Sequence, residues 1–117
     1  MSGATRLRRL DEHASITVIE RGDAVSLATC GMPFVLSETI AHRGDLLLQT
    51  PERLRDRFAL DVRVGTTAVS IDRAAQELVV DGPSGVERLG YDTLVLATGA
   101  KAVRPAIPGI ERAHVLR

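Results

Sequence analysis

One cysteine, Cys30, is the residue of this chain best suited to covalent chemistry. It lies in the segment SLATCGMPF, directly before Gly31 and three residues before Pro33. A free cysteine is most often a buried residue that behaves as a small hydrophobe. A cysteine in a loop beside a helix start can instead have its thiolate stabilised by the helix dipole. The glycine beside it would leave room for a second sulfur or a flat ring, so the segment alone leaves both interpretations open.

Two further features could contact a ligand. Glu20 ends a run of β-branched residues, and a carboxylate at this place in a dinucleotide-binding unit can accept hydrogen bonds from ribose hydroxyls. The segment ATGA, residues 97–100, follows a second apolar run, and its small residues would let the backbone approach a ligand closely. Each feature also has an alternative without a ligand. Glu20 could be a solvated residue at the end of a strand, and residues 97–100 could be an ordinary connection from a strand to a loop.

Other kinds of site find little support in the residues. His13, His42 and His114 have no ligand-like spacing to Cys30, so we expect no metal site. No Ser-His-Asp arrangement can be argued. A single cysteine excludes an intrachain disulfide and indicates a reducing, cytoplasmic setting.

The overall composition argues against nucleic-acid and membrane partners. Lys plus Arg and Asp plus Glu number 15 each, so no net charge would attract a polyanion or an anionic bilayer. No apolar run approaches the roughly 18 residues of a spanning helix, and the N-terminus shows no signal-peptide core. The length of 117 residues suits one small domain.

Hydrophobic periodicity and turn residues predict the elements that must position these features. We expect a helix over residues 1–13, a buried strand over 15–22, and a loop that carries Cys30. A second helix should begin with Thr50 as N-cap and Pro51 at its first position. Three short strands, at residues 62–64, 68–72 and 77–80, should form an antiparallel meander, and residues 81–85 a turn. We expect a second buried strand at residues 93–96 and an extended Pro-rich exit at residues 103–110.

Two buried strands far apart in the chain predict an α/β fold, a parallel sheet with an inserted antiparallel β-meander. Such a sheet begins with a strand, whereas this chain begins with a helix. The dinucleotide fingerprint Gly-x-Gly-x-x-Gly, expected before the first helix, is also absent, since Gly3 lies inside the predicted helix. We therefore expect a partial Rossmann-like domain that lacks the first strand and the glycine-rich loop.

Four segments together resemble a known family. They are ATRLRRLDE, VIERG followed by VSLATCGMPF, LLLQTPERLRDRF, and YDTLVLATGAKAVRPAIPG, and they cover nearly the whole chain. The chain resembles the N-terminal FAD-binding segment of the flavin-dependent pyridine nucleotide–disulfide oxidoreductases. It is most similar to the single-cysteine branch, which contains the coenzyme A-disulfide reductases and their NADH oxidase and persulfide reductase relatives.

The resemblance implies a partial FAD-binding domain over residues 1–117, with the NAD(P)H-binding and dimerisation domains of a homodimeric parent outside it. FAD would be the cofactor and NAD(P)H the reductant. Cys30 would be the redox-active catalytic residue. The residues implied to bind FAD are Glu20 at the adenosine ribose, Arg21 and Ala68 near the adenine, and Thr98 and Gly99. Those implied to meet coenzyme A are Ser2, Arg6, Arg9, Ser26 and Thr29.

The resemblance also implies a reaction. Cys30 would attack coenzyme A disulfide, or a related persulfide, and form a mixed disulfide with one coenzyme A. In an oxidase or peroxidase it would instead cycle through a sulfenic acid. We expect residues 1–117 alone to be inactive and to retain FAD poorly. An alternative function from a different class is also open. The chain could be a non-catalytic remnant that pairs with another chain through its open strand edges.

Overall fold

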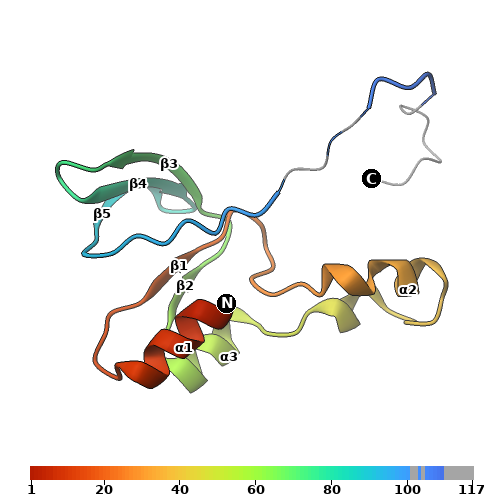
Figure 1. Cartoon of the computed structure of the whole chain (residues 1–117), viewed down its shortest axis with the longest axis horizontal. Helices are drawn as coiled ribbons and strands as arrows, with labels where there is room; N and C mark the ends of the chain where they lie inside the picture. The colour runs from red at the N-terminus through yellow and green to blue at the C-terminus, as the bar shows by residue number, and fades with distance from the viewer. Residues whose placement is uncertain (101–102, 104, 110–117) are drawn as a thin grey trace.

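A two-stranded parallel sheet, a three-stranded meander and three α-helices make up the part of the chain described by the computed structural model, residues 1–100, 103 and 105–109 (Figure 1). The helices are α1 (Ser2–Leu10), α2 (Met32–Leu36) and α3 (Pro51–Phe58), with 3₁₀ turns η1 (Thr29–Gly31) and η2 (Arg43–Leu46). The strands are β1 (Thr17–Ile19), β2 (Asp61–Arg63), β3 (Thr67–Asp72), β4 (Glu77–Gly82) and β5 (Gly85–Gly90).

The main core lies where α1 and α3 meet the parallel pair. β1 runs parallel to β2 with Val18 opposite Val62. Leu54 of α3 packs with Leu60 and Val62 in a buried cluster, and Met1 of the α1 end packs against it. The predicted first helix and first strand are therefore confirmed, although the helix ends at Leu10 and the strand is shorter than expected.

The predicted start of the second helix is confirmed in detail. Thr50 has extended backbone and its hydroxyl accepts a hydrogen bond from the Arg53 N–H at 3.3 Å. Pro51 opens the helix, where its missing N–H has no intrahelical partner to lose. The helix ends at Phe58. The next residue, Ala59, adopts left-handed backbone with φ of 47°, and its N–H bonds back to the last helical turn.

Arg8 joins the ends of α1 and α3. Its Nε donates to the Phe58 carbonyl at 2.9 Å, and its Nη2 donates to the carbonyls of Ala59 at 3.2 Å and Ala14 at 2.6 Å. Its Nη1 donates to the carbonyls of Asp11 at 3.3 Å and Glu12 at 2.5 Å. The carbonyl of Phe58, the last residue of α3, lacks an intrahelical partner and carries partial negative charge. The guanidinium of Arg8 therefore satisfies the end of α3 and also binds the segment just after α1.

The antiparallel meander forms as predicted over residues 68–72 and 77–80, but its third strand was assigned wrongly. Residues 62–64 were expected in the meander, whereas β2 pairs with β1 and β5 completes the meander. The turn explains the difference. Gly82 pairs with Gly85 across Pro83 and Ser84, so the chain after the turn continues directly as the antiparallel partner of β4.

The second buried strand predicted over residues 93–96 is also wrong. No strand forms there among the described residues, and Val95 and Leu96 are 79% and 68% exposed. An apolar run supplies β propensity, but a strand also needs a neighbour for its backbone groups. In the described part of the chain β1 pairs only with β2, so this run has no ladder to join. Of the predicted Pro-rich exit, residues 103 and 105–107 have no regular structure; Arg104 and Ile110, like His114, lie outside the described residues.

The two sheets are joined at a close contact. Arg63 at the end of β2 binds Asp61 at 2.8 Å and reaches Glu87 of β5 at 3.0 Å. These bonds, chiefly the one with Asp61, raise the pKa of Arg63 above its usual value. Nearby, Thr66 is buried against Gly82, where a Cβ would lie 2.9 Å from the Thr66 hydroxyl oxygen. The meander therefore sits on the end of β2 with no space for a larger residue at position 82.

Replacing Arg8 tests its role in holding the helices together. We expect Arg8→Met to lower the free energy of unfolding by about 2 kcal/mol, because helix-end carbonyls lose a charged donor. Urea denaturation of the purified chain measures this loss. Arg6→Met is the matched control, since Arg6 is exposed on the same helix. Equal stability of the two variants would contradict the assignment.

Candidate functional site

Cys30 lies on the surface, in the 3₁₀ turn η1 that leads directly into α2. The interpretation of Cys30 as a buried apolar residue is therefore wrong. Its neighbour Gly31 is buried, while Thr29 is exposed like the cysteine. Pro33 occupies the first turn of α2, where its missing N–H has no intrahelical partner to lose. The thiol is thus presented to solvent by a turn whose inner side is packed.

A short ladder closes the segment that carries Cys30. The Ala28 N–H donates to the Leu46 carbonyl and the Leu48 N–H donates to the Ser26 carbonyl, each at 2.9 Å. Leu27 and Leu47 form an antiparallel bridge between these bonds. We call residues 29–45, together with this closure, the cysteine loop. Its base is fixed by backbone hydrogen bonds, although its sequence gives no regular strand pattern.

Glu20 stands immediately after β1, as predicted. Its N–H donates to the Arg63 carbonyl at 2.9 Å, and its carbonyl accepts from the Thr66 N–H at 3.0 Å. Its Oε1 accepts the Gly22 N–H at 2.7 Å. The carboxylate is therefore held at the strand end by its own turn, and the second oxygen has no hydrogen-bond donor among the described residues. Arg21 is exposed beside it.

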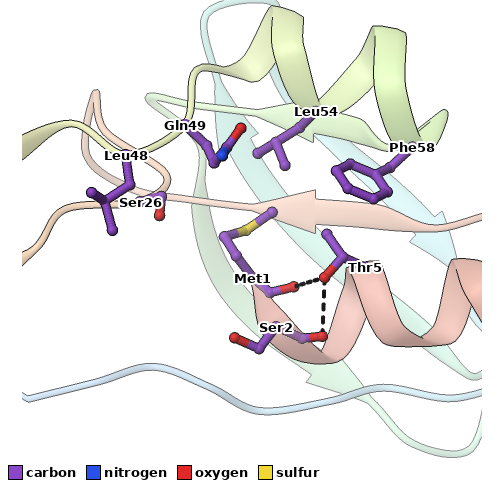
Figure 2. Close-up of a pocket in the computed structure, with 8 residues that line it drawn as sticks. All are labelled: Met1, Ser2, Thr5, Ser26, Leu48, Gln49, Leu54 and Phe58. Atoms are coloured by element: carbon purple, nitrogen blue, oxygen red, sulfur yellow. Dashed lines mark hydrogen bonds between the residues drawn. The ribbon is translucent and has the colours of Figure 1, made fainter.

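One pocket lies between α1, α3 and the base of the cysteine loop (Figure 2). Its volume is about 250 Å³. Its lining combines hydroxyl and amide groups with apolar side chains, contributed by Met1, Ser2, Thr5, Ser26, Leu48, Gln49, Leu54 and Phe58. Whole ligands occupy pockets of roughly 300–1,000 Å³, so this one has room for part of a ligand.

The pocket brings together two residues predicted to bind substrate, Ser2 and Ser26. Thr5 and Gln49 also line the pocket, and neither is among the residues predicted from the sequence. Thr5 follows Met1 by one helical turn, and its hydroxyl donates to the Ser2 carbonyl at 3.2 Å and lies 3.4 Å from the Met1 carbonyl (Figure 2). The helical spacing of residues 1, 2 and 5 could have indicated this shared position.

The other predicted site residues do not line this pocket. Arg6 and Arg9 are exposed on α1, and Thr29 is exposed in η1. Ala68 lies on β3, which is an edge strand of the meander. Thr98 and Gly99 are exposed in a segment without regular structure, where Gly99 adopts left-handed backbone with φ of 66°.

The whole chain, residues 1–117, matches the pyridine nucleotide-disulphide oxidoreductase family. The chain belongs to this family. A coenzyme A disulfide reductase of Staphylococcus aureus is 32% identical over 101 residues, which are 85% of this chain and 23% of that protein. The family assignment confirms the resemblance inferred from the four sequence segments, and the chain spans about a quarter of the length of this curated relative.

Solved structures of family members confirm the fold class. The reduced CoADR-RHD protein of Bacillus anthracis is 41% identical with a TM-score of 0.87, over 94% of this chain and 20% of that one. An NAD-dependent persulfide reductase from A. fulgidus is 37% identical with a TM-score of 0.86, over 92% of this chain and 20% of that one. The α/β arrangement with a parallel pair and a meander is therefore that of part of a family member.

The described residues contain neither a metal-binding cluster nor a helix that could span a membrane. No three His, Cys, Asp or Glu side chains in this part of the chain are placed to hold a metal ion. None of the helices there combines the length and apolar character required to cross a bilayer.

The turn that holds the Glu20 carboxylate can be tested directly. We expect Glu20→Ala to speed hydrogen exchange of the Gly22 amide roughly fivefold, because this amide loses its acceptor. Amide exchange followed by NMR measures it residue by residue. Arg21→Ala, an exposed change in the same turn, should leave the Gly22 amide as it is. An unchanged rate in Glu20→Ala would show that the carboxylate is not held there in solution.

Proposed function

We propose that residues 1–117 are part of the FAD-binding domain of a flavoprotein that passes electrons from NAD(P)H through FAD to Cys30. The substrate would be coenzyme A disulfide or a related persulfide. The observation that carries this proposal is the solvent-exposed thiol of Cys30 on a turn with a fixed base. Family membership supports the oxidoreductase chemistry, and the thiol supplies the atom that would react.

The step assigned to this chain is a thiol–disulfide exchange. The Cys30 thiolate attacks one sulfur of the substrate, and the substrate S–S bond breaks. A Cys30–coenzyme A disulfide forms, and the second coenzyme A leaves as a thiolate with the electron pair. This exchange has no net change in oxidation state. Release of the bound coenzyme A then requires two electrons from the reductant.

The flavin site we propose is centred on Glu20. The residues assigned to FAD are Glu20 for the adenosine ribose, with Arg21, Ala68, Thr98 and Gly99 around it. The fit rests on the Glu20 carboxylate, which is held at the end of β1 with one oxygen bonded to Gly22. Its second oxygen can accept from a ribose hydroxyl. FAD, when bound, would supply a two-electron carrier between NAD(P)H and the disulfide.

The coenzyme A site we propose includes the pocket and the outer face of α1. Ser2 and Ser26 would bind part of the substrate inside the pocket. Arg6 and Arg9 are exposed cations that can pair with phosphate groups, and Thr29 lies beside the thiol. We propose that residues 1–117 alone can carry out the attack on the substrate, but that they cannot complete a catalytic cycle. The whole protein would be a cytoplasmic homodimer.

The exchange step can be tested on the chain itself. Incubated with coenzyme A disulfide, it should gain one coenzyme A by intact-mass spectrometry, because the exchange needs only the thiolate. Cys30→Ser should gain none, and dithiothreitol should reverse the adduct. No adduct on the unmodified chain would contradict the proposal. A sulfenic acid trapped by dimedone after peroxide treatment, without any coenzyme A adduct, would favour the oxidase chemistry instead.

A further inference from the structure

Gly31 packs against the side chain of Leu46, so a larger residue at this position would force one of the two to shift. A Cβ at this position would lie 2.5 Å from Leu46 Cδ2, 3.8 Å from Leu46 Cγ and 3.7 Å from Ile40 Cδ1. Real Cβ atoms essentially never come within 3.0 Å of another heavy atom in this way. A side chain at position 31 would therefore have to move either the turn that carries Cys30 or the side chain of Leu46.

Leu46 has little freedom to move away. It is 3% exposed, and it lies at the end of η2. Its carbonyl accepts the Ala28 N–H at 2.9 Å, while the Ala28 carbonyl accepts the Gly31 N–H at 2.9 Å. Ala28 thus links the backbone of Leu46 to the turn, and the Leu46 side chain closes on the same turn from its inner side.

The same ladder borders the pocket. Ser26 and Leu48, which exchange the outer hydrogen bond of the ladder, both line the pocket wall. The inner hydrogen bond, between Ala28 and Leu46, lies next to the cysteine turn. Displacement of Leu46 would therefore change where the thiol stands relative to the pocket.

We propose that Leu46 is a positioning residue for Cys30. Its side chain fills the notch left by Gly31 and fixes the direction in which the thiol meets a disulfide bound partly in the pocket. This inference rests on the proposed role of Cys30 as the reacting thiol.

The test compares three variants of the full chain. Gly31→Ala should slow the reaction of Cys30 with coenzyme A disulfide about tenfold, because displacing a reacting group by an ångström has effects of this order or larger. Its reaction with iodoacetamide, which needs no bound substrate, should change by less than about twofold. Adding Leu46→Ala to Gly31→Ala should restore the first rate, since the clashing atoms are removed. Gly44→Ala is the control, because nothing lies within 4 Å of a Cβ there.

Two results would overturn the inference. One is a Gly31→Ala rate equal to that of Gly44→Ala. The other is a double variant as slow as Gly31→Ala, which would place the cause in the Gly31 backbone and not in Leu46. Circular dichroism checks that each variant folds. If the double variant does not fold, Leu46→Met takes the place of Leu46→Ala, since its flexible side chain can vacate the notch.

A second readout separates this inference from the proposed function. A trifluoroethyl disulfide label on Cys30 reports the position of the turn by its ¹⁹F chemical shift, without coenzyme A. The shift should change in Gly31→Ala and return in the double variant. If the chain shows this pattern but forms no coenzyme A adduct, the proposed substrate is wrong and the positioning contact stands. An unchanged ¹⁹F chemical shift in Gly31→Ala would show that the contact between Gly31 and Leu46 does not position the turn.

Discussion

The guanidinium of Arg8 is the interaction on which much of this structure depends. Helix α1 has no fully buried residue, so its own packing contributes little to holding it in place. Arg8 ties α1 to the end of α3 through the Phe58 carbonyl, and it binds the segment after α1 through the Glu12 carbonyl. The pocket lies between the same two helices, with Ser2 and Thr5 on one side and Leu54 and Phe58 on the other. The contact between Arg8 and Phe58 thus helps to hold together the two helices that border the pocket.

A second set of contacts joins the proposed flavin residue to the meander. Glu20 shares backbone hydrogen bonds with Arg63 and Thr66, and Arg63 continues to Glu87 of β5. Thr66 is buried against Gly82 of β4. The backbone of Glu20 is therefore positioned by residues more than 40 positions later in the chain, whereas its carboxylate is held by the Gly22 N–H. Ribose recognition at Glu20 would depend on this long-range packing as much as on the strand that precedes it.

Local patterns in the sequence predicted local structure well. The Thr50–Pro51 helix start, the Asp81–Gly85 turn and the helix after Met1 each follow from residues within one turn of each other. Family resemblance also predicted the fold class, and the comparisons confirm it.

Pairing across long distances was harder to predict. Residues 17–19 and 93–96 both lie in apolar runs that predict a buried strand, and only the first pairs with another strand in the described part of the chain. The contact of Gly31 with Leu46 and the place of Gln49 in the pocket depend on how the cysteine loop folds back. No periodic pattern in the sequence predicts how the loop folds back. The loop is closed by backbone hydrogen bonds, and these can form whatever the side chains are.

The parallel pairing of β1 with β2 also has a kinetic consequence. Each hairpin of the meander joins neighbouring segments, so it can form within microseconds. Thr17 must instead find Asp61 across the whole cysteine loop and α3, and the entropy of closing that long segment is lost before the ladder forms. The meander should therefore be structured early, with the parallel pair and the cysteine loop assembling late. The Cys30 thiol would reach its final position only near the end of folding.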